Sequence, residues 1–223
     1  MKRYDTVYLL LSGVFLASLV IANSLVFKFF DINLPWVGAV TLSVGILPYP
    51  VTFLCTDLVS ELYGKKRADA LVIVGLLISL YMIFLLQVGR AVPVSHLQDP
   101  AIQEHYVAVF GSSTRAIVAS MAAYLVAQFL DVRLYHFWKK LTDGKHLWLR
   151  NNGSTMLSQF FDTTIVITVL FAGVWSTKDL MAAIAAGYVF KLIIAALDTP
   201  FMYLGVYLLS DVEAESRSLG IVD

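Results

Sequence analysis

The chain has 223 residues, of which 59% are hydrophobic and only 14% are charged, and its mean hydropathy is +0.77. Since soluble domains carry about 25% charged residues, this composition excludes an ordinary soluble protein and predicts an all-α membrane protein. The formal net charge of zero provides no basic surplus for direct binding to nucleic acid. The single cysteine, Cys55, excludes an internal disulfide and fits no metal motif, so we expect neither a metal nor another cofactor.

Several apolar segments reach the length of about 20 residues that a helix needs to cross a bilayer. The sequence predicts six spans in one bundle, over residues 6–28, 36–61, 68–90, 112–136, 154–175 and 180–209. Pro48 and Pro50 should kink or interrupt the second span, because proline donates no backbone hydrogen bond. We expect a single transmembrane domain over residues 1–210, followed over residues 211–223 by a short, disordered cytoplasmic tail.

Basic residues gather on alternate connections between the predicted spans. They are Lys2, Arg3, Lys65, Lys66, Arg67, Lys139, Lys140, Lys145 and Arg150. The positive-inside rule places this side, with both termini, in the cytoplasm of a multi-pass membrane protein. The connection over residues 91–111 would face outward and has room for a short surface helix. Its two histidines, His96 and His105, have a spacing that matches no metal site.

Small residues recur at four-residue spacing in two of the predicted spans, at Ala119, Ala123 and Ala127 and again at Ala182 and Ala186. This spacing lets helices approach closely. Packing within the bundle is the favoured interpretation, and a homo-oligomer face is the alternative.

Polar and ionisable residues at membrane depth usually mark a site or a pathway, because an unpaired charge in the bilayer is costly. The candidates for substrate binding are Asn23, Asp57, Arg115, Gln128, Asp131, Asn152, Gln159, Asp162, Lys191 and Asp198. With a rise of about 1.5 Å per residue, Asp162 and Lys191 both reach the middle of their helices. We therefore predict an ion pair between them, which either fixes the helix register or bounds a substrate cavity.

The stretch "TDLVSELYGKKRADA" places Asp57 and Glu61 on one helix face, just before a basic run over residues 65–67. Glu61 is interpreted as a helix-end ion-pairing residue that the basic run neutralises. Asp57 lies about a turn deeper, where it would pair with Lys191 or Arg150, or stay protonated until a substrate arrives. Replacing Asp57 should abolish uptake and replacing Glu61 should leave most of it, unless Asp57 only braces neighbouring helices.

Five stretches carry a resemblance to a known family: "IANSLVFK", "PYPVTFLCTDLVSELYGKKRA", "RAIVASMAAYLVAQFLDV", "WLRNNGSTMLSQFFDT" and "DTPFMYLGVYLL". By these motifs the chain resembles the Vut_1 family, the vitamin-uptake-like queuosine precursor transporters. The resemblance implies a six-helix inner-membrane importer of 7-deazaguanine bases such as preQ0 and preQ1, which precede the modified tRNA nucleoside queuosine. It also implies similarity in size and helix count to the substrate-binding subunits of energy-coupling-factor vitamin transporters.

A deazaguanine presents N–H donors, a carbonyl acceptor and a flat ring. Asp57, Asp131 or Asp162 can accept from the donors, and the amides and cations above can donate to the carbonyl. Tyr49, Tyr124 or Phe161 can stack on the ring.

Two other functions remain as alternatives. One is a vitamin-type substrate-binding subunit that requires an ATPase module, since the chain has no GxxxxGK[ST] loop of its own. The other is an intramembrane enzyme with an aspartate dyad or with His136 or His146 as a base. We expect no enzyme, because the sequence contains no GxGD, HExxH or GxSxG signature.

Overall fold

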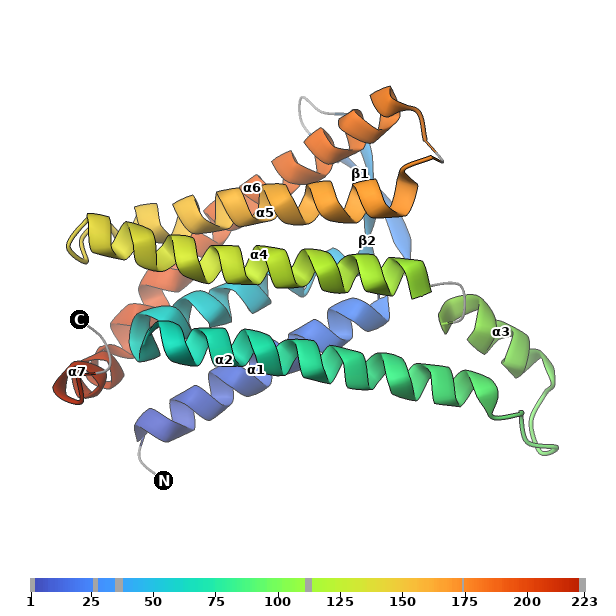
Figure 1. The fold of residues 1–223 in the computed structure, drawn as a ribbon, viewed down its shortest axis with the longest axis horizontal. Helices are drawn as coiled ribbons and strands as arrows, with labels where there is room; N and C mark the ends of the chain where they lie inside the picture. Colours follow the sequence, from blue (N-terminus) through green and yellow to red (C-terminus); the bar gives the residue numbers. More distant parts are fainter. Residues whose placement is uncertain (1–2, 26–27, 35–37, 111–113, 174, 221–223) are drawn as a thin grey trace.

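The structure, a computed structural model, describes residues 3–25, 28–34, 38–110, 114–173 and 175–220. Long helices lie side by side, with the chain ends near one end of the bundle (Figure 1). The elements in chain order are α1 (Arg3–Leu25), β1 (Phe29–Leu34), β2 (Gly38–Ser43), the 3-10 helix η1 (Val44–Ile46), α2 (Tyr49–Ala91), α3 (Ala101–Phe110), α4 (Thr114–Leu141), α5 (Leu147–Phe171), α6 (Thr177–Leu208) and α7 (Ser210–Ser218). A helix overlaps each of the six predicted spans.

The predicted start of the second span, at residue 36, is wrong, because β1 and β2 form an antiparallel hairpin before the helix begins. Its register runs from Phe29 opposite Ser43 to Leu34 opposite Gly38. β-branched residues in both strands favour the extended backbone. The helix begins only after η1, at Tyr49, with Pro48 as its N-cap and Pro50 in its first turn. Proline is tolerated there because the first turn of a helix needs no backbone donor.

Gly64 divides α2 into two helical segments, residues 49–63 and 65–91, and the chain doubles back at this point (Figure 1). Its φ of 77° lies in the left-handed region, which glycine adopts without the penalty that a Cβ atom brings. The predicted break between the second and third spans is therefore present, as one buried glycine rather than a loop. The first segment is only about 22 Å long, which is shorter than the hydrocarbon core of a bilayer.

Close packing joins α1, the second segment of α2 and α4. The Tyr124 hydroxyl donates to the carbonyl of Val72 at 3.0 Å. A Cβ atom at Gly75 would lie 2.4 Å from that hydroxyl and 2.9 Å from Phe15, so only glycine fits there. The predicted small residues of α4, Ala119, Ala123 and Ala127, are fully buried, which confirms their role in bundle packing. In α6, Ala182 is exposed and Ala186 half-buried.

The segment after Asp211 is helical rather than disordered as far as residue 218. In α7, Glu213 and Arg217 form an i,i+4 ion pair at 2.6 Å. On a neighbouring face Val212 is buried, and the Ser216 hydroxyl donates to the carbonyl of Leu62 beside the Gly64 turn. The tail folds because one of its faces covers this turn. The connection over residues 91–111 contains the helix α3, which confirms the predicted short surface helix.

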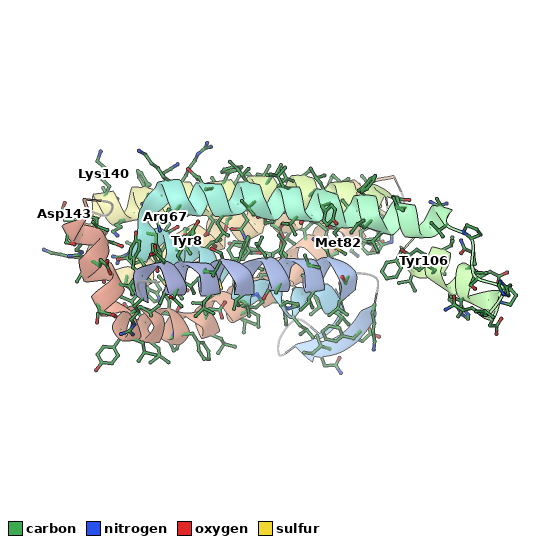
Figure 2. The ribbon with its side chains drawn as sticks, turned by 90° about the horizontal axis from the view of Figure 1, so that it is seen from below. Tyr8, Arg67, Met82, Tyr106, Lys140 and Asp143 are labelled. Atoms are coloured by element: carbon green, nitrogen blue, oxygen red, sulfur yellow. The ribbon has the colours of Figure 1, made fainter. Side chains whose placement is uncertain are left out.

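Within the described residues, three helical segments are long and apolar enough to cross a membrane by length and composition, Arg3–Leu25, Val44–Ala91 and Thr177–Leu208. Large hydrophobic side chains such as Leu77, Phe84 and Tyr207 are exposed on the outside of the bundle, as expected where helices face lipid. Figure 2 shows Arg67, Lys140 and Asp143 at the end where α7 lies, while Tyr106 lies toward the other end. The fold is thus that of an all-α membrane protein with one short hairpin.

Candidate functional site

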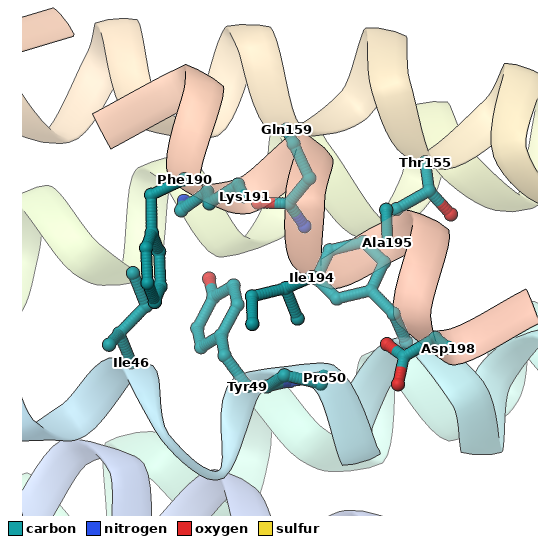
Figure 3. A pocket seen from close by; sticks show the side chains of 11 residues that line it. Ile46, Tyr49, Pro50, Thr155, Gln159, Phe190, Lys191, Ile194, Ala195 and Asp198 are labelled. Atoms are coloured by element: carbon teal, nitrogen blue, oxygen red, sulfur yellow. The ribbon is translucent and has the colours of Figure 1, made fainter. Parts of the chain in front are cut away.

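A pocket lies where η1 and the first turn of α2 meet α5 and α6 (Figure 3). It has about 320 Å³ of empty volume, a figure that includes open solvent at its mouth. Its lining consists of Ile46, Tyr49, Pro50, Phe53, Thr155, Gln159, Phe190, Lys191, Ile194, Ala195 and Asp198. A mostly apolar lining with a few polar groups is typical of sites for flat organic molecules.

Three polar groups, each from a different helix, meet at one wall of this pocket. The Lys191 ammonium pairs with one carboxylate oxygen of Asp162, and the Tyr49 hydroxyl donates to the other at 3.0 Å. The Lys191 nitrogen also lies 5.1 Å from the centre of the Tyr49 ring. The predicted ion pair between Asp162 and Lys191 is therefore confirmed. Asp162 lies behind the lining, and an ammonium has three donors, so Lys191 can still donate to a ligand.

Gln159 and Asp198 add an amide and a carboxylate to the lining. Gln159 is only 4% exposed, and its amide oxygen has no hydrogen-bond partner among the described residues. In Figure 3, Asp198 lies at the opposite end of the pocket from Phe190. The pocket therefore offers an acceptor, an amide and a cation along its length, together with the aromatic rings of Tyr49 and Phe190.

Other predicted site residues lie away from this lining and link helices to one another. Asn152 on α5 donates to the Thr199 hydroxyl on α6 at 2.7 Å. Asn23 on α1 donates to the Ser79 hydroxyl at 3.5 Å, and Gln128 on α4 accepts from the Thr56 hydroxyl at 3.4 Å. The side chain of Arg115 lies outside the described residues.

Asp57 does not pair with Lys191 or Arg150, which differs from the prediction. Its carboxyl group is 2% exposed and interacts with the carboxyl group of Asp131 on α4, and its Oδ1 has no hydrogen-bond partner among the described residues. Asp131 is fully buried and accepts a hydrogen bond from the Ser158 hydroxyl at 3.0 Å. The partner differs because Lys191 and Arg150 are already engaged by the carboxylates of Asp162 and Glu61.

Glu61 forms an ion pair, but not with the basic run that follows it. It is 1% exposed and is bound in two places by Arg150, at 2.6 Å and 3.1 Å. Lys139 lies 3.2 Å away and the Tyr135 hydroxyl donates at 2.8 Å. In the basic run, Lys65 instead pairs with Asp69. The Gly64 turn directs Glu61 inward toward α4 and α5.

Sequence reasoning missed most of the apolar lining, in particular Phe190 and Ile194. In a chain that is 59% hydrophobic, nothing in the sequence separates a residue that faces a pocket from one that faces lipid. Of the aromatic residues considered for stacking, Tyr49 lines the pocket. Tyr124 is buried against Val72, and Phe161 is 44% exposed.

Two bacterial proteins are similar in sequence to this chain. The chain is similar to a "Probable queuosine precursor transporter" of Bacillus subtilis (strain 168), with 29% identity over 179 residues, which cover 79% of this chain and 76% of the relative. A protein of the same name from Haemophilus influenzae (strain ATCC 51907 / DSM 11121 / KW20 / Rd) is 28% identical over 128 residues, covering 57% and 51%. No solved structure shows a significant match.

The Vut_1 family model, described as "Putative vitamin uptake transporter", matches residues 43–205. This range contains every residue that lines the pocket, from Ile46 to Asp198. The match covers most of the chain, and the chain therefore belongs to the Vut_1 family of transporters.

Proposed function

We propose that the chain imports a queuosine precursor, a 7-deazaguanine base such as preQ0 or preQ1, across the inner membrane for queuosine modification of tRNA. The observation that carries this proposal is the pocket between α2, α5 and α6, in which Gln159, Lys191 and Asp198 surround an apolar, aromatic cavity. Both relatives are named as probable queuosine precursor transporters, which supports the same substrate class.

The polar groups suit the edge of such a base. The carbonyl oxygen of the base accepts from Lys191, whose other contact is the Asp162 carboxylate. The adjacent N–H groups donate to the carboxylate of Asp198 or to the amide oxygen of Gln159, which lacks a partner among the described residues. The flat ring lies against Tyr49 or Phe190. Each of these hydrogen bonds offsets the cost of removing a polar group from water.

The arrangement in the membrane is part of the proposal. The six spans are α1, the two segments of α2, α4, α5 and α6, a number that resembles the substrate-binding subunits of energy-coupling-factor transporters. Both termini face the cytoplasm, because Arg67 and Lys140 lie near the α7 end of the bundle (Figure 2) and basic residues are retained on that side.

A labelling experiment tests this orientation. In a Cys55→Ala background, Gln98→Cys on the connection before α3 should react with an impermeant thiol reagent applied to intact cells. Lys140→Cys, exposed at the other end of the bundle, serves as the control and should react only after the membrane is broken. The opposite pattern would overturn the orientation.

Uptake by the purified chain tests the function. Proteoliposomes that contain only this protein should take up labelled preQ0, and the compound recovered from the lumen should be chemically unchanged. Binding without uptake, with uptake restored by an ATPase module, would instead identify a substrate-binding subunit. A converted product would indicate an enzyme, and the absence of both binding and uptake would exclude the proposed substrate.

A further inference from the structure

Two buried carboxyl groups, those of Asp57 on α2 and Asp131 on α4, lie beside the hydrogen bond that the Thr56 hydroxyl donates from α2 to Gln128 on α4 at 3.4 Å. Asp57 is 2% exposed and Asp131 is 0% exposed. Asp57 Oδ1 and Asp131 Oδ2 both have no hydrogen-bond partner among the described residues. A proton on one of the two carboxyl groups supplies the donor that these buried oxygens lack.

The surroundings of the pair increase the need for this proton. The other acidic groups that act on Asp57 are Asp198 on α6 and Glu61 on its own helix. Around Asp131, the side chains of Ser154, Thr155 and Ser158 on α5 provide hydroxyl groups. The ion pairs between described residues include none to either aspartate, because Lys191 is paired with Asp162, and both Arg150 and Lys139 with Glu61. Ionisation of both carboxyl groups is strongly disfavoured, because it would place two like charges close together and away from water.

The pair is connected to the pocket by two residues. Thr155 lines the pocket, and its backbone carbonyl lies 3.0 Å from the Ser158 hydroxyl that donates to Asp131. Asp198 lines the pocket and interacts electrostatically with Asp57. A base that donates to Asp198 therefore changes the field at Asp57, and a contact with Thr155 reaches Asp131 through Ser158. Substrate binding and the protonation of the pair are thermodynamically linked through these contacts, and the linkage acts in both directions.

We propose that the Asp57–Asp131 pair binds the proton that drives uptake, so that this protein is a proton symporter. The inference rests on the proposed import of a deazaguanine base. The proton enters from the outside with the substrate and is held between the two carboxyl groups. It leaves one carboxyl oxygen for water on the cytoplasmic side. The empty carrier then returns with one more negative charge between α2 and α4 than the loaded carrier has. The loaded and the empty carrier therefore differ electrostatically.

Accumulation under a pH gradient tests the coupling. With membrane potential clamped at zero, a gradient of one pH unit, acidic outside, should support about a tenfold accumulation of the uncharged preQ0 if one proton accompanies each molecule. A protonophore should abolish this accumulation. Asp57→Asn and Asp131→Asn should lose the dependence on the pH gradient, while some exchange of labelled for unlabelled preQ0 remains. Asp69→Asn, in the Lys65 surface pair, is the matched control and should accumulate preQ0 as the wild type does.

Infrared spectroscopy of the substrate-free protein provides a readout that does not depend on transport. The wild type should show the C=O stretch of a buried carboxylic acid at neutral pH, and the double variant Asp57→Asn/Asp131→Asn should lack it. If the wild type takes up preQ0 without any response to the pH gradient, the inference is wrong while the proposed function stands. Uptake that follows a sodium gradient, or an infrared band that persists in the double variant, would equally overturn the inference. A wild type that neither binds nor takes up preQ0 would refute the proposed function, and the infrared band would then still report whether the pair holds a proton.

Discussion

Glu61→Gln should lower the free energy of unfolding by about 3–5 kcal/mol, because it leaves the buried cations without their carboxylate. Glu61 is held by both Arg150 and Lys139, and it is almost completely removed from solvent. This geometry revises the expectation from sequence that Glu61→Gln would keep most of its uptake. The variant should lose uptake in proportion to its loss of folded protein.

The measurement is the unfolding of the purified protein in detergent. The double variant Glu61→Gln/Arg150→Met should be less destabilised than the sum of its two single variants, since it removes both members of the buried pair. The exposed pair of Lys65 and Asp69 is the matched control, and Lys65→Ala should cost no more than about 1 kcal/mol. Additive losses in the double variant would show that Glu61 and Arg150 are not coupled.

Lys191→Met should reduce the binding and uptake of preQ0 about ten- to a hundredfold, which corresponds to the loss of one charge-assisted hydrogen bond of about 1.5–3 kcal/mol. Lys191 is the ammonium group that lines the pocket, and Asp162 holds it in place from behind. Single Asp162→Asn should also reduce uptake, because Lys191 then loses the partner that orients it. Lys178→Met, exposed in the first turn of α6, is the control and should behave as the wild type does.

The double variant Asp162→Asn/Lys191→Met separates a structural role from a role in binding. Removing both charges should restore part of the stability that each single variant loses. It should not restore the binding of preQ0, since no cation then faces the carbonyl oxygen of the base. If this double variant is stable and binds preQ0 normally, the ion pair only fixes the register of α5 and α6.

Composition and hydropathy determined the class of this protein, because apolar stretches of bilayer length and few charges have no stable arrangement in water. The pairing of Asp162 with Lys191 also followed from sequence, since two opposite charges at the same depth each need a partner. The hairpin before Tyr49 was missed, because β2 is apolar enough to resemble the start of a span and β1 falls in the short connection before that span. The tail helix α7 was missed because its stability depends on the surface that it covers at the Gly64 turn.

For Asp57 and Glu61, the tertiary structure alone decided which groups they meet. Sequence spacing placed Asp57 and Glu61 on one face of a helix, but it did not show what faces them. The turn at Gly64 and the packing of α4 and α5 bring Arg150 and Lys139 to Glu61, and Asp131 to Asp57. The energy of a charge inside a membrane depends on neighbours that are distant in the chain. The sequence can therefore identify the residues that need partners, and only the fold selects the partners.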